Sequence, residues 1–492
     1  MEVGNIKRRI LVIVPLYITE VDAIKIKNDL MRYKWDDTEI DVRGLKGNIA
    51  VNSSSEADIA TPEFLKLVEE AKNEYDAIIS YCYMDVGVTV AKELVNIPVV
   101  GPLEASAIIA NLLGPKFSVI TVGTVASSIE PRLRELGLDN NYVSTKNISF
   151  EEYFVFSTDP EKVKIMKNAL IRNIEKALVD GASVIILGCT GLPTAEDLKE
   201  YFKVPIIDGT VALKVAEVLI DIRRSDKMIS SLNEQKSETV KPPKIKIKLI
   251  IPTSKSPESQ FMRELKKIVN KGTDIDVTSF KDGPESIKSG YDIAMVSPFI
   301  IREAVEAEKE GFNAIIISSF VDPALRSARE VCNIPVIGLG ETSMLIACML
   351  GKRFSIITYD KQVIPIIENI VRKIGIERKL VSIMTTSKEV WDEKEMYENI
   401  RKAIANGAEV VIVGGDIVQN PIPSIQTDIK VPIINPLVTA LKMAEALCSL
   451  GLSHSKLAYP KPVLPTYHKE RIKKLEEIPK DCMFLYSTIV NN

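Results

Sequence analysis

The sequence predicts an α/β protein built as a tandem repeat of a two-lobed unit, in which each lobe is a doubly wound, mainly parallel sheet flanked by helices. Two observations predict this architecture. Residues 77–121 align without a gap with residues 314–358, and 21 of the 45 aligned positions are identical. Short unbroken runs of Val and Ile also alternate with amphipathic stretches, which is typical of parallel strands that helices cover on both faces.

The repeat divides the chain into four segments. Residues 181–189 also resemble residues 407–415, so the similarity extends well beyond the first block. We predict a first domain at 1–222, a linker at 223–246, a degenerate second domain at 247–452 and a tail at 453–492 that drapes over the surface or is partly loose. The linker is rich in Ser, Lys, Glu and Pro, with few apolar side chains to offset the entropy of ordering. We expect the two copies to form an intramolecular pseudo-dimer, and further homo-oligomerisation stays open.

The apolar runs of the first copy give its strands in chain order. The predicted strands are residues 10–14, 39–42, 77–80, 99–100, 117–121, 147–149, 183–187 and 206–207. Between them, apolar residues recur at helical spacing. The predicted helices are residues 61–73, 88–95, 129–136 and 160–180, with Pro131 in the first turn of its helix. Two lobes fit this pattern, and ligands of such sheets bind outside the carboxyl ends of the strands.

The composition excludes several classes of protein. Hydrophobic residues make up 46% and charged residues 26% of the 492 residues, and the net charge of −3 lacks the positive excess of a nucleic-acid binder. No apolar run reaches the length of about 20 residues that spans a bilayer, and the start does not have the pattern of a signal peptide. Six scattered cysteines argue against a disulfide scaffold or a zinc ribbon. We expect a cytoplasmic protein with a small-molecule substrate and no metal, nucleic-acid or membrane partner.

Histidine is almost missing from the chain. His454 and His468 are the two histidines, and both lie near the carboxyl terminus. A histidine base, a Ser-His-Asp triad or a histidine-ligated metal in the main body is therefore nearly excluded. Chemistry in this protein must use cysteine, carboxylate, lysine or hydroxyl groups.

Two cysteines occupy the positions that the strand-end rule selects. Cys82 follows the predicted strand 77–80 and precedes the predicted helix 88–95, and Cys189 follows strand 183–187 ahead of a helix expected near Thr194. A helix amino terminus favours an anion and lowers the pKa of a nearby thiol below its usual value of about 8.5. Because one cysteine lies in each lobe, facing lobes could place them on opposite sides of one ligand.

These cysteines carry a resemblance to a known family. Ser-Tyr-Cys-Tyr-Met-Asp at 80–85 resembles the first cysteine motif of the Asp/Glu/hydantoin racemase superfamily, and Leu-Gly-Cys-Thr-Gly at 187–191 resembles the second. The resemblance covers residues 8–222 and, weakly, the second copy. It implies a cofactor-independent racemase in which one thiolate removes the α-proton and the opposite thiol delivers another. Gly191 stands where amino-acid racemases of the superfamily often have histidine, which favours the hydantoin-like branch.

The resemblance also implies a set of site residues. Cys82 and Cys189 are the expected acid and base, and the substrate is a hydantoin-like molecule or an amino acid with an acidic C–H next to a carbonyl. The carbanion needs hydrogen-bond donors aimed at that carbonyl. The expected substrate-binding residues are Thr121, Gly123, Thr124, Thr190, Gly191 and, on an earlier loop, Ser53.

The second copy has lost both thiols. Cys82 aligns with Ser319 and Cys189 with Gly415, so proton transfer by the same mechanism is not available there. The favoured interpretation is an inactive partner that supplies an interface, and the alternative is a ligand-sensing pocket formed by Ser319, Asp322 and Asp416. Asp322 recurs as Asp85 in the first copy, and we predict that each caps the helix that follows it.

Other functions stay open on the sequence alone. A maleate-type cis–trans isomerase would form a covalent adduct between one cysteine and a double bond. A two-lobed regulator could bind a small molecule without turnover. Buried cysteine also often serves as a small apolar side chain, so Cys82 and Cys189 could be core thiols. Glu104 and Glu341 occur in both copies, which favours a structural role for them.

Overall fold

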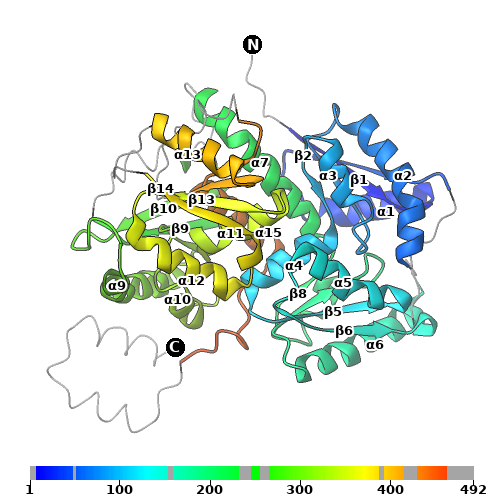
Figure 1. Ribbon diagram of the computed structural model, residues 1–492. Coiled ribbons are helices and arrows are strands. Elements are labelled where there is room, and N and C mark those ends of the chain that lie inside the picture. The colour runs from blue at the N-terminus through cyan, green and yellow to red at the C-terminus, as the bar shows by residue number, and fades with distance from the viewer. Residues whose placement is uncertain are drawn as a thin grey trace, which may run out of the picture. The chain divides into compact units, whose positions relative to one another are not determined.

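The chain folds into two compact units, residues 1–223 with 374–378 and residues 224–373 with 379–492, and each contains one copy of the repeat (Figure 1). The computed structural model describes residues 7–47, 51, 53–152, 159–231, 245–254, 265–266, 268–386, 393–414 and 429–462. Four four-stranded sheets, two in each copy, organise the described part of the chain.

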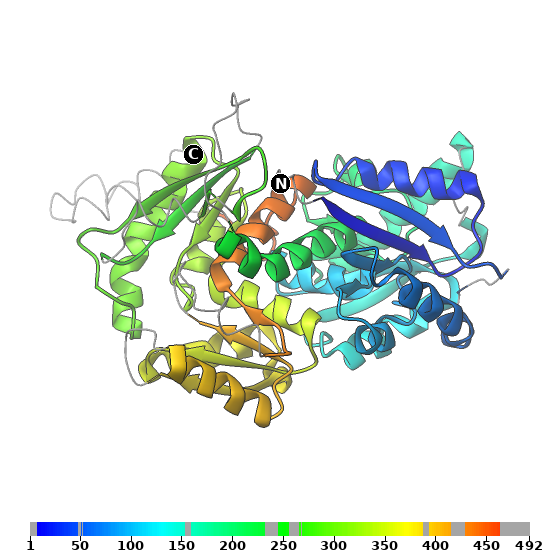
Figure 2. The same ribbon diagram turned by 90° about the horizontal axis from the view of Figure 1, so that it is seen from above.

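The first lobe is a parallel sheet in the order β2-β1-β3-β4. Its strands are β1 (Arg8–Val14), β2 (Thr38–Gly44), β3 (Ala77–Ser80) and β4 (Val99–Val100). Its helices are α1 (Glu20–Met31), α2 (Ser54–Ala71) and α3 (Val88–Leu94). Figure 2 shows α1 on one side of these strands and α2 on the other, so the sheet is covered on both faces.

The second lobe repeats the same strand order as β6-β5-β7-β8, again with parallel pairs. Its strands are β5 (Phe117–Val122), β6 (Tyr142–Ile148), β7 (Val184–Leu187) and β8 (Ile206–Ile207). Its helices are α5 (Ala126–Leu136) and α6 (Pro160–Val179), with short 3-10 turns at Gly123–Val125, Phe150–Glu152 and Ala195–Leu198. Helix α4 (Pro102–Leu113) enters this lobe from the first one, and all of its residues are buried.

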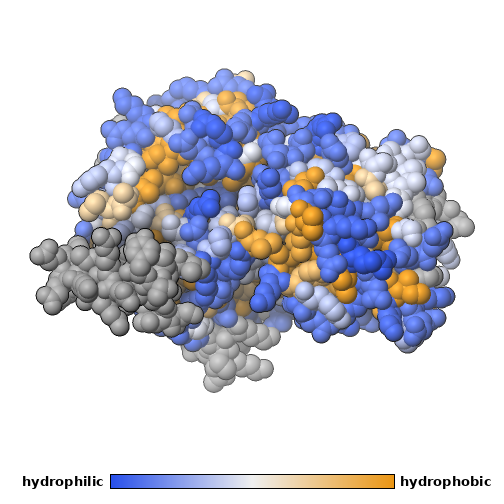
Figure 3. Space-filling model, turned by 90° about the horizontal axis from the view of Figure 1, so that it is seen from below, coloured by the Kyte–Doolittle hydropathy of each residue, from blue (hydrophilic) through white to orange (hydrophobic). Residues whose placement is uncertain are grey.

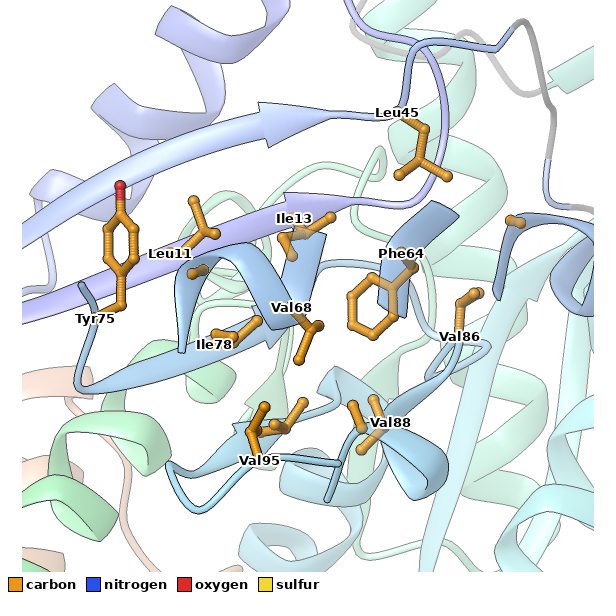
Figure 4. Packing of buried hydrophobic residues seen from close by; sticks show 14 of the residues in the cluster. Leu11, Ile13, Leu45, Phe64, Val68, Tyr75, Ile78, Val86, Val88 and Val95 are labelled. Carbon is orange, nitrogen blue, oxygen red and sulfur yellow. The ribbon is translucent and has the colours of Figure 1, made fainter. Parts of the chain in front are cut away.

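Apolar packing fixes the turn that follows β3 (Figure 4). Phe64 and Val68 lie on the buried stripe of α2 and pack against Leu11 of β1 in one apolar cluster. Residues four positions apart share a helix face, which is why this stripe meets the sheet. The Phe64 ring also lies against Gly87, whose φ of 67° is left-handed and whose missing Cβ leaves room for the ring.

Helix α7 (Val211–Ser231) returns from the second lobe to the first. Its Glu217, which is fully buried, accepts hydrogen bonds from the Trp35 N–H at 2.8 Å and the Thr38 hydroxyl at 2.6 Å. Lys214 lies one turn earlier and donates to the same carboxylate at 2.9 Å. The Glu217 carboxylate therefore connects the turn before β2 to α7, the last helix of the first repeat, by hydrogen bonds.

The second unit reproduces both lobes, with sheet orders β10-β9-β11-β12 and β14-β13-β15-β16. Its strands are β9 (Ile245–Ile251), β10 (Thr273–Ser279), β11 (Ala314–Ile317), β12 (Val336–Gly338), β13 (Phe354–Thr358), β14 (Leu380–Thr385), β15 (Val410–Val413) and β16 (Ile433–Ile434). Its helices are α9 (Gly290–Lys309), α10 (Leu325–Val331), α11 (Leu339–Leu350), α12 (Ile364–Ile374), α13 (Glu393–Ala405) and α15 (Pro436–Leu450), with 3-10 turns at Lys361–Val363 and Glu377–Lys379.

The predicted fold class is confirmed, and several element limits differ. Strand β6 begins at Tyr142, well before the predicted start at 147, and Pro131 lies inside α5 and not in its first turn. Helix α7 runs to Ser231, into the segment predicted as a linker, of which 232–244 lies outside the described residues. The start of the predicted surface tail is partly buried, because His454 accepts a hydrogen bond from the Val336 N–H at 2.8 Å.

The exposed surface is mixed in character. The face in Figure 3 is mainly hydrophilic and is interrupted by separate apolar patches. Across the described residues, the helices are either too short or too polar to cross a membrane.

Candidate active site

Cys82 lies in the turn that connects β3 to α3. Its N–H donates to the Ser80 carbonyl at 2.8 Å, and its own carbonyl accepts the Asp85 N–H at 2.8 Å. The Met84 N–H donates to the thiol sulfur. The residue is half-buried. This tight turn holds the thiol at the carboxyl end of a central strand, the edge at which ligands of parallel sheets bind.

Asp85 fixes this turn by capping a helix, although not the helix that the sequence predicts. Its carboxylate accepts the N–H groups of Leu103 at 3.0 Å and Glu104 at 2.9 Å, so it caps α4, and the prediction that it caps α3 is wrong. Asp85 has a left-handed φ of 47°. A Cβ at Gly101 would overlap the carboxyl group, which is why glycine is required there. The close approach of turn and helix then leaves Cys82 little freedom.

Cys189 follows β7 and is held by β5. Gly188 donates its N–H to the Ile120 carbonyl at 2.7 Å, and the Gly188 carbonyl accepts the Thr121 hydroxyl hydrogen at 2.7 Å. A Cβ at Gly188 would overlap Val119. Thr121 is fully buried. Its single hydroxyl hydrogen is used within the fold, so the interpretation of Thr121 as a substrate donor is corrected to that of a residue that positions the Cys189 backbone.

The two thiols influence one another electrostatically. Burial raises the pKa of Cys82 to about 12, the Met84 N–H acts in the opposite direction, and a negative charge on Cys189 raises it further. The expectation of a lowered pKa is therefore wrong for Cys82. Helix α3 begins only at Val88, so the thiol gains little from the helix dipole, whose effect is confined to the first turn. Burial therefore favours the protonated thiol of Cys82 over its thiolate.

Side chains from the two lobes meet beside these cysteines. A Cβ at Gly209 would lie 3.2 Å from the Thr190 methyl carbon and 3.5 Å from the Tyr81 hydroxyl oxygen. Tyr81 belongs to the first lobe and the other two residues to the second. The lobes also meet where the Ser54 and Ser128 hydroxyls lie 3.3 Å apart. The carboxyl ends of both sheets therefore face a common region of the first repeat.

The other predicted substrate-binding residues lie on loops at these strand ends. Gly123 begins the 3-10 turn after β5 with a left-handed φ of 55°, and Thr124 beside it is exposed. Thr190 and Gly191 are half-buried directly after Cys189. Ser53 is the amino-terminal cap of α2, because its side chain accepts the Glu56 N–H at 3.3 Å.

Two residues near the cysteines have no role in the sequence prediction. Tyr81 reaches Gly209, and Asp208 accepts the Ala195 N–H at 2.8 Å and the Thr210 N–H at 3.0 Å. Asp208 thereby ties the loop after Cys189 to the start of α7. An aromatic residue directly before the first cysteine is the sequence signal that could have identified Tyr81.

The corresponding positions of the second repeat are organised differently. Asp322 caps α11 through the N–H groups of Gly340 at 3.0 Å and Glu341 at 2.7 Å, so its carboxylate is already engaged. Asp322 thus has the same capping role as Asp85, and the ligand-sensing interpretation stays a prediction. Ser319 is buried, and Asp416 lies outside the described residues. Among the described residues of both repeats, no three His, Cys, Asp or Glu side chains cluster as metal ligands would.

The chain is similar to known racemases in both repeats. The sequence model described as Asp/Glu/hydantoin racemase matches residues 40–216 and again residues 250–444. A hydantoin racemase of Pseudomonas sp. (strain NS671) is 32% identical over 223 residues, which cover 43% of this chain and 90% of that protein. One of Rhizobium meliloti is 32% identical over 236 residues, or 45% and 98%. A solved allantoin racemase from Klebsiella pneumoniae is 24% identical with a TM-score of 0.41, and the match covers 45% of this chain and 97% of that one.

Proposed function

This chain belongs to the Asp/Glu/hydantoin racemase family, whose sequence model matches both of its repeats, and we propose that its first repeat racemises hydantoins without a cofactor by means of Cys82 and Cys189. The chain is an isomerase of the racemase type. Hydantoin is the proposed substrate class because the two curated relatives at 32% identity are both hydantoin racemases.

One observation carries the two-cysteine proposal. Cys82 and Cys189 follow the central strands of two different lobes, and a charge on Cys189 changes the pKa of Cys82. Racemisation needs a base on one face of a carbon and an acid on the other, and a pair of like groups serves both directions. The raised pKa of Cys82 suits the acid, so Cys189 acts as the thiolate base in the form of the enzyme that is ready for one enantiomer.

The proton balance of the reaction closes on the two sulfurs. Cys189 thiolate takes the hydrogen from C5 of the hydantoin, and the C–H electron pair moves toward the adjacent carbonyl to give an enolate. Cys82 then delivers its thiol proton to the opposite face of C5. Cys82 ends as a thiolate and Cys189 as a thiol, which is the form that acts on the other enantiomer.

Loop groups at the strand ends bind the substrate carbonyls. The Thr190 hydroxyl, the Thr124 hydroxyl and the backbone N–H groups near Gly123 and Gly191 supply donors, and Ser53 adds its hydroxyl at the start of α2. Such donors stabilise a developing oxyanion because they are oriented before the reaction begins. The second repeat serves as a non-catalytic partner, because serine and glycine occupy the cysteine positions.

Single cysteine variants test this function. In deuterated buffer, the wild-type chain should invert either enantiomer of a 5-substituted hydantoin and add deuterium at C5. Cys82→Ser and Cys189→Ser should each lose inversion by a factor of about 10³ or more, because one face of the carbon then has no partner for proton transfer. Polarimetry follows the inversion, and proton NMR follows the loss of the C5 hydrogen.

A matched control uses a cysteine with a structural role. The Cys348 thiol is buried and donates to the Met344 carbonyl, a bond that serine can replace, so Cys348→Ser should keep wild-type turnover. Retention of inversion by either Cys82→Ser or Cys189→Ser would contradict the two-base assignment. A stable thioether adduct with maleate, seen by mass spectrometry without hydantoin turnover, would favour the cis–trans isomerase instead.

A further inference from the structure

Tyr81 connects the two lobes at the level of the cysteines. Its N–H donates to the Ile13 carbonyl of β1 at 2.8 Å, which fixes its backbone at the end of the sheet. From there its ring extends to Gly209, where an added Cβ would lie 3.5 Å from both the ring carbon Cε2 and the hydroxyl oxygen. The Thr190 methyl carbon lies 3.2 Å from the same added Cβ. The phenol therefore ends beside the residue that follows Cys189.

The Tyr81 hydroxyl has no hydrogen-bond partner among the described residues, although only 7% of the residue is exposed. The neighbouring buried tyrosine differs, because the Tyr83 hydroxyl lies 3.1 Å from the Ser106 hydroxyl. The Tyr81 oxygen is not among the fully enclosed polar atoms that lack a partner in the described part of the chain, so it keeps contact with solvent. The Tyr81 hydroxyl lies near the ends of the strands that precede the two cysteines, where it is available to a ligand.

The charges around Tyr81 keep its hydroxyl protonated. Burial raises the pKa of Tyr81 far above its ordinary value, and negative charges on Asp208, Asp29 and Cys189 act in the same direction. At neutral pH the group is a hydrogen-bond donor, and its sensitivity to Cys189 places it in the field of that sulfur. Thr121 cannot serve in its place, because its hydroxyl hydrogen is donated to Gly188.

We propose that Tyr81 donates a hydrogen bond to the substrate carbonyl oxygen next to the reacting carbon and stabilises the enolate, which makes it a third catalytic residue. This inference rests on the proposed racemisation. When a thiolate removes the C5 hydrogen, the C–H electron pair becomes the C–C double bond and the carbonyl π pair moves to oxygen. The Tyr81 proton stays on the phenol throughout. The enolate collapses when the opposite thiol returns a proton to C5.

The second repeat lacks this tyrosine together with both cysteines, which supports a catalytic role for Tyr81. The position of Tyr81 is taken there by Ser318, whose buried hydroxyl also has no partner among the described residues but is too short to reach across to another lobe. Tyrosine and both thiols occur together in the first repeat, and all three are replaced in the second.

Two tyrosine variants of the full chain separate catalysis from stability. Tyr81→Phe keeps the ring and removes only the hydroxyl, so kcat for hydantoin racemisation should fall by about 10²–10³ while KM changes less than about threefold. Its thermal midpoint should stay the same or rise, because the lost hydroxyl has no partner to leave unsatisfied. Tyr83→Phe should show the reverse pattern, with kcat kept within about threefold and a lower thermal midpoint.

The outcomes distinguish this inference from the function on which it rests. Wild-type racemisation together with a Tyr81→Phe variant of nearly unchanged kcat would overturn the role of Tyr81 and leave the two-cysteine function intact. A wild-type chain that neither inverts hydantoins nor exchanges their C5 hydrogen would overturn both. A loss of kcat in Tyr81→Phe with preserved folding and KM supports the enolate contact.

Discussion

The two repeats anchor the turn after their third strand in the same way. Asp85 and Asp322 have left-handed φ values of 47° and 48°, and each caps the buried helix that enters the next lobe. In both copies a glycine, Gly101 or Gly338, leaves room for that carboxyl group. Because the repeat without thiols keeps these contacts, they serve the fold. What differs between the copies is therefore the better guide to the chemistry.

The side chains that this turn presents have changed between the copies. In the first repeat, the Tyr83 hydroxyl lies 3.1 Å from the Ser106 hydroxyl. In the second, Phe320 replaces Tyr83, and its ring would lie 2.9 Å from a Cβ placed on Gly414 at the end of β15. Gly414 corresponds to Gly188, the residue before the second cysteine. The second repeat thus lacks the Tyr83 hydroxyl. The Phe320 ring packs there against the end of β15, the position that precedes Cys189 in the first repeat.

Each repeat has a buried Lys–Glu ion pair in its last helix, and removing the carboxylate should give the largest loss of stability. Glu217 on α7 accepts from Lys214, and Glu445 on α15 accepts from Lys442 at 3.1 Å and from the Asn270 N–H at 2.8 Å. Glu217→Ala and Glu445→Ala should each lower the free energy of unfolding by about 3–5 kcal/mol, because a buried lysine loses its carboxylate. Urea denaturation of the full chain measures both losses.

An exposed pair supplies the control for this prediction. The Lys72–Glu69 pair lies at 2.8 Å on the surface, so Glu69→Ala should change the unfolding free energy by no more than about 0.5 kcal/mol. Similar losses for the two buried variants would show that the repeats depend equally on this pair. A loss below about 1 kcal/mol in one of them would show that this repeat does not depend on its buried ion pair.

Alanine substitutions of Gly188 and Gly414, the glycines before the second cysteine position in each repeat, should separate effects on activity from effects on stability. A Cβ at Gly188 would overlap Val119, and a Cβ at Gly414 would lie close to the Phe320 ring. Each glycine-to-alanine change should cost about 1–3 kcal/mol through overpacking. Only Gly188→Ala should also reduce kcat, because it displaces the backbone that carries Cys189. A Gly414→Ala variant that loses hydantoin turnover while it stays folded would show that the second repeat takes part in catalysis.

The sequence identifies elements whose pattern is local and misses features that depend on tertiary contacts. The β-branched runs at 77–80, 99–100 and 206–207 predict their strands to the residue. Strand β6 is an edge strand with partly exposed, mixed side chains, so its apolar pattern is weak. Helix α4 is buried on every side and has no polar face to reveal its period.

The site shows the same division. The placement of Cys82 and Cys189 at strand ends follows from the order of strands and loops alone. The engagement of Thr121 with the Gly188 carbonyl depends on the register between β5 and β7, which no local pattern encodes. The raised pKa of Cys82 depends on burial by residues distant in sequence, whereas the sequence argument considers only the nearest helix.

Proton uptake by the two capping carboxyls should differ least between the two repeats. Burial raises the pKa of Asp85 and of Asp322 to about 7, in each case against the backbone N–H groups that they accept. The neighbouring Glu104 and Glu341 raise the pKa further, and Arg132 and Arg329 lower it. In the unfolded chain both carboxyls titrate near their ordinary value of about 4. Between these values the folded state binds more protons, so stability should rise as the pH falls from 7.5 to 5.5.

Each carboxyl should contribute about 2 kcal/mol to that rise. Asp85→Asn and Asp322→Asn should each remove their share of the pH dependence, whatever they change in absolute stability, because the amide does not titrate. Urea midpoints measured at pH 7.5 and 5.5 for the wild type and both variants give the two shares by difference. Equal shares would extend the likeness of the repeats from geometry to electrostatics. A pH dependence that Asp85→Asn removes and Asp322→Asn leaves whole would mean that only the thiol-bearing turn carries a titrating carboxyl, and that the common cap geometry conceals two different charge environments.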